Sequence, residues 1–259
     1  MIKCIGREID TALQRKNTYW YAIGIVALCI IANVAVVAFR GVYGANEGTY
    51  AYNIMEYGVW SFVVAYLSCI YISDIVFGKE YPKDEDYEGL SRIQIYIVKL
   101  VASAALALVF LVIAYVVFIA VTSIFQFKDG AVTSVSIRSF CDKLFLALPL
   151  FIAGIAFGNM FLFSIKNKKW AYAGFFIVTF AIPRAIILLS TEAGAKICLY
   201  IKPYLISQCF MLIPYPTNPD RNVALIISLG FIYAIISTII GICLYSRCKE
   251  SADDNKQSS

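Results

Sequence analysis

One charged segment, Phe77–Leu100, lies between two long apolar runs of the sequence. Acidic and basic side chains that cluster in this way form ion pairs and hydrogen bonds with water or with another protein surface, because lipid offers them no partner. The chemistry that the segment offers is that of a docking surface or of a solvated loop, and both interpretations are open from the residues alone. Its charged residues are Lys79, Glu80, Lys83, Asp84, Glu85, Asp86, Glu88, Arg92 and Lys99.

The second half of this segment carries a helix-start signal. Ser91 and Gln94 have the spacing of a capping box, in which the hydroxyl and the amide each accept a hydrogen bond from a backbone N–H of the first turn. Leu90 and Ile95 occupy the positions of a hydrophobic staple. We therefore predict a helix that begins at Ser91 and, because no charge follows Lys99 in the next apolar run, continues into the membrane as one rod.

Residue types that commonly carry catalysis are scarce. The sequence contains no histidine, which excludes histidine metal ligands, Ser-His-Asp and Cys-His nucleophilic sites and histidine proton relays. Gly78-Lys79 lacks the upstream glycine and the following Ser or Thr of a phosphate-binding loop. We therefore predict no catalytic residues, no metal or cofactor bound by this chain, and no ATP hydrolysis of its own.

The eight cysteines are scattered, without a C-x-x-C pair. Most of them lie in or beside apolar runs, where cysteine behaves as a small hydrophobic residue. Cys198 and Cys209 are expected to face the outside of the cell, where their spacing is compatible with a disulfide or with two free thiols.

The composition places these residues in a membrane protein. Of the 259 residues, 61% are hydrophobic and 15% are charged, which excludes an ordinary soluble domain. Runs of about 18 or more residues that are nearly free of charge predict membrane-spanning helices, so we expect an all-α polytopic protein with six transmembrane helices. The runs are Trp20–Phe39, Tyr57–Phe77, Leu100–Phe125, Leu144–Ile165, Trp170–Ser190 and Val223–Ser246.

The lysines and arginines indicate the orientation. Most of the 22 basic residues fall on one side of the membrane if the chain starts inside, and the positive-inside rule then predicts that both termini are cytoplasmic. Basic residues beside anionic lipid also account for the net charge of +5 without a nucleic-acid partner.

The N-terminal residues 1–18 are predicted to form a helix that does not cross the membrane. Ile2, Ile5, Ile9 and Leu13 recur at helical spacing, which is typical of an amphipathic interface helix that lies on the cytoplasmic leaflet. A plain membrane anchor and a direct contact with a partner protein are both compatible with this pattern.

A second apolar segment, residues 197–213, is too short and too interrupted to cross. The break falls at Lys202-Pro203, which favours a re-entrant or interfacial hairpin before the last span. The polar tail, residues 249–259, is predicted to be disordered.

Charged residues in or beside the predicted spans have alternative roles. Asp74 lies near the inner end of the second span, where we expect it either to be wetted or to pair with Arg92 or Lys99. Arg184 follows Pro183, which removes a backbone hydrogen bond and predicts a kink. This arginine is expected either to snorkel to the outer interface or to line a polar path.

Small residues mark one expected helix contact. Gly154 and Gly158 in the fourth span form a small-xxx-small face, with Pro149 shortly before it. Such a face permits close packing of transmembrane helices, although glycine is common in spans generally.

The order of these parts resembles the permease subunits of type-2 ATP-binding-cassette exporters. The interface helix, the six spans and the re-entrant segment cover residues 1–248. The pattern Phe-x-x-Glu-Tyr, followed by Ser-Arg-x-Gln-Ile-Tyr-x-x-Lys-Leu, covers only the charged loop. It is carried by Phe77, Glu80, Tyr81, Ser91, Arg92, Gln94, Ile95, Tyr96, Lys99 and Leu100.

This resemblance implies a bacterial plasma-membrane core of two permease copies, or of a permease and a paralogue, which binds separate ATPase subunits. ATP would be bound by the partner subunit. The loop at residues 78–90 would be the coupling element, and it is about one helical turn shorter than expected for the family. The residues that would take part in coupling are Phe77, Glu80, Tyr81, Ser91 and Arg92.

The implied activity is export of an amphipathic or hydrophobic cargo, such as an antimicrobial peptide, a lipid or a drug. A stand-alone secondary transporter or channel is the alternative, and it would need intramembrane charges or a polar helix face that the sequence does not display. An intramembrane enzyme would need paired catalytic residues at facing depths.

Overall fold

The computed structural model describes residues 1–43, 58–59, 61–78, 89–125, 132–191, 195–214 and 219–257. Within these ranges all regular secondary structure is helical, which confirms the all-α part of the predicted fold class. The elements are α1 (Ile2–Leu13), α2 (Lys16–Tyr43), α4 (Ser61–Phe77), α5 (Arg92–Phe125), α6 (Ser134–Ser164), α7 (Lys168–Phe176), a π-helical segment (Ile177–Ala181), α8 (Ile182–Thr191), α9 (Lys196–Ile201), a 3₁₀ turn (Lys202–Tyr204), α10 (Ile206–Leu212) and α11 (Pro219–Gln257).

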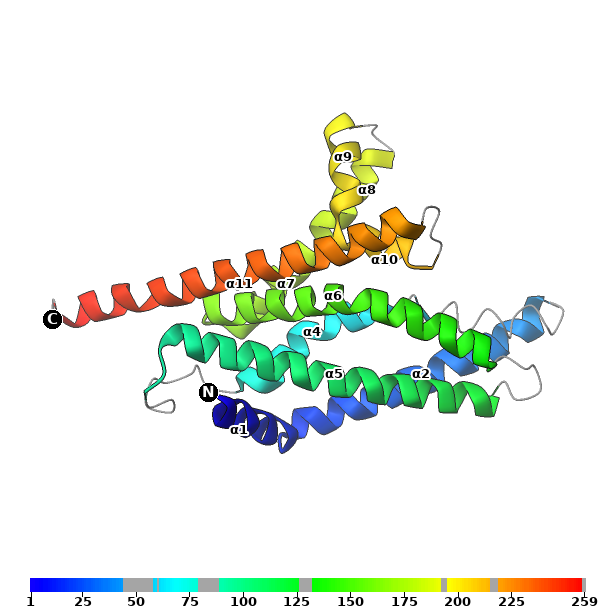
Figure 1. Cartoon of the computed structure of the whole chain (residues 1–259), viewed down its shortest axis with the longest axis horizontal. Coiled ribbons are helices and arrows are strands. Elements are labelled where there is room, and N and C mark those ends of the chain that lie inside the picture. The colour runs from blue at the N-terminus through cyan, green and yellow to red at the C-terminus, as the bar shows by residue number, and fades with distance from the viewer. Residues whose placement is uncertain are drawn as a thin grey trace.

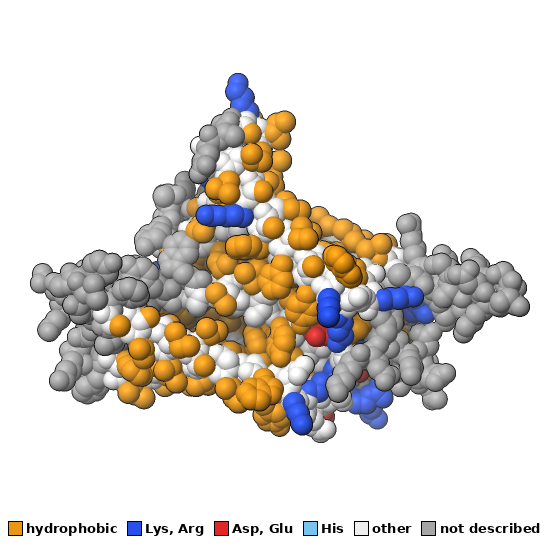
Figure 2. Space-filling model, turned by 180° about the vertical axis from the view of Figure 1, so that it is seen from behind, with side chains coloured by type: hydrophobic (Ala, Val, Ile, Leu, Met, Phe, Trp, Pro, Cys, Tyr) orange, Lys and Arg blue, Asp and Glu red, His pale blue; other side chains and the backbone are white. Residues whose placement is uncertain are grey.

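The long helices α5, α6 and α11 run side by side and form an elongated bundle with α2 and α4 (Figure 1). Helix α1 and both chain termini lie toward the same end of this bundle, whereas α8 and α9 project from its side (Figure 1). On the face shown in Figure 2, hydrophobic side chains cover most of the described middle of the molecule, and Lys and Arg side chains gather toward one end.

Five helical stretches are long and apolar enough to cross a membrane, which supports a polytopic membrane protein. The second predicted span, Tyr57–Phe77, coincides with α4, whose 17 residues are apolar but fall just short of full span length, so six spans are not confirmed. At 1.5 Å per residue α4 is about 26 Å long, against a hydrocarbon core of about 30 Å. The full-length stretches are Lys16–Ala35, Arg92–Phe125, Ser134–Ser164, Lys168–Thr191 and Asn222–Ser246.

Helix ends differ from the predicted ones where a local capping signal decides. The interface helix ends at Leu13 rather than at residue 18, and α2 begins at Lys16. In the first turn of α2, the Thr18 hydroxyl donates a hydrogen bond back to the Ala12 carbonyl oxygen of α1, which closes the turn between the two helices. Helix α6 begins at Ser134, because Thr133 forms a capping box there.

The tail also differs from its prediction, because α11 continues to Gln257 instead of ending in a disordered segment at residue 249. Extending an existing helix adds one hydrogen bond for each residue fixed. No glycine or proline follows Gly241 to stop that extension.

Pro183 follows a π-helical segment, Ile177–Ala181, that separates α7 from α8. Proline lacks the N–H that would continue the α-helical ladder, and wider π-helical turns are a common way to accommodate such a defect. At this point the chain leaves the bundle and continues into the projecting helix α8 (Figure 1). The predicted interruption at Pro183 is therefore present.

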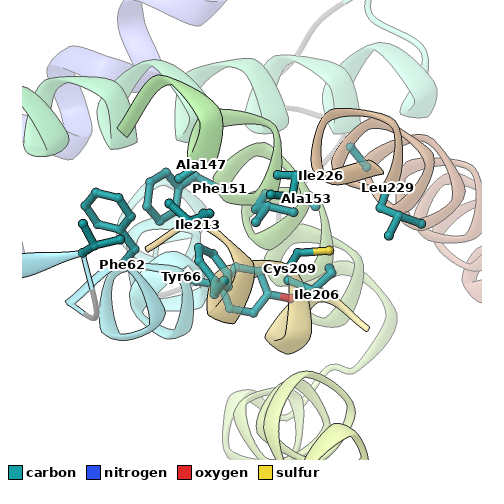
Figure 3. Packing of buried hydrophobic residues seen from close by; sticks show 14 of the residues in the cluster. Phe62, Tyr66, Ala147, Phe151, Ala153, Ile206, Cys209, Ile213, Ile226 and Leu229 are labelled. Atoms are coloured by element: carbon teal, nitrogen blue, oxygen red, sulfur yellow. The ribbon is translucent and has the colours of Figure 1, made fainter. Parts of the chain in front are cut away.

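Helix α6 forms the centre of the bundle. In the most apolar stretch of α6, 56% of the residues are buried, against 11% in the corresponding stretch of α5. Helix α6 is therefore surrounded by other helices, whereas α5 leaves one side exposed. The main core cluster joins α6 to α4, α10 and α11 (Figure 3). Its labelled members are Phe62, Tyr66, Ala147, Phe151, Ala153, Ile206, Cys209, Ile213, Ile226 and Leu229.

Glycines set the closest helix contacts of α6. A Cβ on Gly154 would lie 2.8 Å from the Tyr66 ring, and one on Gly158 would lie 3.0 Å from the Ile70 Cα, so the predicted small-xxx-small face packs directly on α4. On the other side, a Cβ on Gly230 of α11 would lie 2.7 Å from the carbonyl carbon of Pro149. Because the obstacle is backbone, α11 would have to move away from α6.

We predict that Gly230→Ala lowers the stability of the protein by about 1–3 kcal/mol, the usual cost of overpacking. The matched control is Gly24→Ala in α2, where no atom lies within 4 Å of the added Cβ. There alanine should be neutral or stabilising by up to about 1 kcal/mol. Thermal unfolding in detergent, followed by far-ultraviolet circular dichroism, measures both variants. Equal stability of the two would contradict the close α6–α11 contact.

Candidate coupling site at the end of α4

The charged loop connects the end of α4 to the start of α5, and the structure describes its two ends. Phe77 and Gly78 close α4, and Gly89 to Arg92 lead into α5. Glu80 and Tyr81, the residues for which a docking role is predicted, lie outside the described residues. The site is therefore built from the side chains that hold the two ends of the loop.

The predicted start of α5 is confirmed. The Gln94 backbone N–H donates to the Ser91 hydroxyl oxygen at 3.3 Å, and the Ser91 N–H donates to the Gln94 side-chain oxygen at 2.8 Å. Helix α5 then runs without interruption for 34 residues, a length of about 50 Å. The loop therefore leads directly into one long helix.

Arg92 fixes the first turn of α5 to the C-terminal half of α11. Its guanidinium carbon lies 5.3 Å from the centre of the Tyr245 ring, within the range of a cation–π contact. Its Nη1 also reaches the Tyr245 carbonyl oxygen at 3.5 Å. One turn later in α5, Tyr96 is fully buried and packs against Gly241 of α11.

Phe77 is packed inside the protein. It is 5% exposed, and its ring meets Phe163 of α6 edge to face, with the ring centres 5.1 Å apart. The Lys168 ammonium lies 5.7 Å from the Phe77 ring centre. Phe77 thus belongs to the interior packing at the end of α4 and is not an exposed side chain.

Lys99 is paired with a residue of the interface helix. Its Nζ lies 2.6 Å from a carboxylate oxygen of Glu8, and the two side chains are only 5% and 8% exposed. The same ammonium donates to the Val76 carbonyl oxygen of α4 at 3.0 Å. This one group therefore joins α1, α4 and α5.

Asp74 does not pair with Arg92 or Lys99, so that predicted pairing is wrong. One carboxylate oxygen accepts from Lys168 of α7, and the other accepts from the Tyr172 hydroxyl at 3.2 Å. Lys99 instead donates hydrogen bonds to the Glu8 carboxylate and to the Val76 carbonyl oxygen. A buried carboxylate such as Glu8 needs a cation beside it, which explains why Lys99 pairs with Glu8.

Helix α1 uses much of its apolar face for protein contact. Ala12 is fully buried, and Ile5 and Ile9 pack against a core cluster that includes Ile75 and Val76 of α4. The Arg15 guanidinium, at the turn after α1, donates to the Ile75 carbonyl oxygen. Interface helix and bundle are thus tied together at the end of α4.

Of the predicted span charges, Arg184 is the one that lies apart from the polar contacts at the end of α4. It is exposed on α8, in the projecting part of the chain (Figure 1), and forms no ion pair with any residue that the structure describes. Its two predicted roles, snorkelling and lining a polar path, stay predictions.

The described cysteines are free thiols, so Cys198 and Cys209 are not joined by a disulfide. Cys209 packs inside the core cluster, and burial raises the pKa of its thiol to about 12. A thiol that stays protonated at neutral pH is a poor nucleophile. In the described ranges no group of three or more His, Cys, Asp or Glu side chains is arranged to hold a metal ion.

Sequence reasoning gave no site role to three charged residues that meet at the end of α4, namely Glu8, Arg15 and Lys168. Glu8 lies between Ile5, Ile9 and Ala12 on the apolar stripe of the N-terminal helix, and an acid on such a stripe is a signal for a buried cation partner. Lys168 carries no comparable signal, since the sequence shows it only as one of several lysines in a short basic turn.

No model of a known protein family matches this chain, and no curated protein matches its sequence.

The buried pair gives a prediction for stability. Lys99→Met should destabilise the protein by about 3–5 kcal/mol, because it removes the cation that pairs with the buried Glu8 carboxylate. Replacing both partners, Glu8→Met with Lys99→Met, should recover most of this loss, since apolar residues of similar size often substitute for a buried pair. A smaller loss should remain, because the Val76 carbonyl oxygen no longer has its donor.

Thermal unfolding in detergent compares the single and the double variant. A double variant as unstable as Lys99→Met alone would show that the loss comes from packing and not from an uncompensated charge.

Proposed function

We propose that this chain is the transmembrane permease subunit of an ATP-driven exporter of the type-2 class. It would work in a bacterial plasma membrane with both termini in the cytoplasm, as two copies or with a paralogue. A separate ATPase subunit would bind ATP and dock on the loop at residues 78–90. The cargo would be amphipathic or hydrophobic, such as an antimicrobial peptide, a lipid or a drug.

The observation that carries this proposal is the continuity of α5 with the loop. A capped first turn at Ser91 and Gln94 leads into an uninterrupted apolar helix of 34 residues. A rigid helix of this kind moves as a body when its end is displaced. A partner bound to the loop would therefore move groups deep in the membrane.

The two ends of the loop are held in place, which supports the same proposal. Gly78 and Gly89 have positive φ values of 88° and 79°, so the chain turns sharply where it leaves α4 and where it approaches α5. Arg92 holds the α5 side to α11, and Lys168 holds the α4 side to α7.

The proposed span plan counts α4 as the second of six crossings and assigns α9 and α10 to a re-entrant hairpin. The chain between α8 and α11 breaks at Lys202–Tyr204, where the sequence predicts it. Helices α9 and α10 have 6 and 7 residues, too few to cross. Helix α10 buries Ile206, Cys209 and Phe210 in the core, which anchors the hairpin to the bundle.

Co-purification tests the proposal. The full chain, tagged and extracted from its native membrane in mild detergent, should bring with it an equal amount of one soluble subunit. Mass spectrometry should identify in that subunit the phosphate-binding loop G-x-x-x-x-G-K-[ST], and the complex should hydrolyse ATP.

The variant Glu80→Ala with Tyr81→Ala should lose at least about tenfold of the bound ATPase, as expected when two central contacts are removed. The matched control is Asp142→Ala, an exposed acid in α6, which should retain it. A folded protein that carries no ATPase, or that transports without one, would overturn the proposal in favour of a stand-alone transporter.

A further inference from the structure

Three cations from three different parts of the chain converge on the end of α4. Arg15 donates to the carbonyl oxygen of Ile75, Lys99 to that of Val76 at 3.0 Å, and Lys168 to that of Gly78. Arg15 lies at the turn between α1 and α2, whereas Lys99 belongs to α5 and Lys168 to α7.

The end of a helix explains why cations gather here. The last carbonyl groups of an α-helix have no intrahelical partner, and together they carry roughly half a negative charge. In this position Ile75, Val76, Phe77 and Gly78 are all buried, so water cannot easily satisfy those carbonyls. Cationic donors satisfy the hydrogen bonds and the charge at the same time.

Gly78 shows how closely this arrangement is fitted. A Cβ on Gly78 would lie 2.6 Å from Nη2 of Arg15, and its φ of 88° is itself unfavourable for any other residue. The guanidinium thus occupies the space beside the glycine. The chain leaves α4 in a direction that Gly78 permits and Arg15 holds.

Carboxylates balance two of the three cations. Glu8 pairs with Lys99, and Asp74 pairs with Lys168, whereas Arg15 forms no ion pair with a described carboxylate. Arg15 therefore meets mainly the negative end of α4 itself, which ties the turn after α1 to that helix through the backbone.

We propose that Arg15, Lys99 and Lys168 are positioning residues that form a clasp at the end of α4. We call these three side chains the α4 clasp. The clasp holds α1, α5 and α7 to one point of the backbone, so that a displacement of the chain after Gly78 moves these helices together. Without it, the last turn of α4 would open and absorb the displacement. The geometry of the clasp stands by itself; its part in ATP-driven movement rests on the proposed function.

Hydrogen exchange on the full chain in lipid nanodiscs tests the clasp without any ATPase. In Lys168→Met, the amides at the end of α4 should exchange at least about tenfold faster, the effect of losing a charge-assisted hydrogen bond. The decisive readout is α1, which should also exchange faster although the bonds of Lys168 shown here go to α4. Faster exchange confined to α4 and α7 would overturn the proposal.

Two matched variants separate the clasp from general damage. Lys169→Met removes the neighbouring exposed charge and should leave exchange unchanged, and Lys168→Arg should restore slow exchange. The pair Glu8→Met with Lys99→Met should keep the fold but loosen the end of α4, because Val76 loses its donor. Unchanged exchange in that double variant would overturn the part assigned to Lys99.

The link to transport is tested in the complex. If an ATPase co-purifies, Lys168→Met should retain the bound ATPase and its ATP hydrolysis but lose at least about tenfold in cargo movement per ATP. Equal cargo movement per ATP would overturn the coupling role while leaving the permease assignment intact. Absence of any ATPase would defeat the proposed function, and the exchange result would still decide whether the clasp exists.

Discussion

The buried end of α4 imposes the constraint on which this part of the structure depends. Helix carbonyls that cannot reach water must find donors elsewhere in the protein. Here the donors come from Arg15, Lys99 and Lys168. Because each lies on a different element, satisfying one helix end also fixes the positions of its neighbours. Polar backbone chemistry thus organises a chain whose other contacts are largely apolar.

Apolar packing follows a different rule, since lipid is as hydrophobic as the protein interior and shape decides which helices associate. Gly158 and Gly230 let α4 and α11 approach α6 at backbone distance from opposite sides. Helix α6 is accordingly the most buried of the candidate spans, whereas α5 exposes a row of valines and isoleucines. The long helix that begins at the loop is thus also one of the least enclosed.

Local signals were predictable from the sequence, and partner choice was not. Ser91 and Gln94 predict the start of α5 because a capping box involves neighbouring residues only, and Pro183 predicts an interruption for the same reason. For Asp74 the sequence leaves open a wetted carboxylate or a pair with Arg92 or Lys99, and it does not indicate the actual partner, Lys168, which is 94 residues away. The length of α4 and the helical tail also differ from prediction, since helix ends depend on weak, distributed preferences.

The distance along the chain between Glu8 and Lys99 has a consequence for biosynthesis. The two residues are separated by 91 positions, so at ribosomal rates of about 5–20 residues per second the carboxylate waits for roughly 5–18 s before its partner has been made. During that time the Glu8 carboxylate cannot form its ion pair with Lys99. Helix α1 can complete its contacts with α5 only after Lys99 has been made, so the first helix of the chain is not the first to reach its final position.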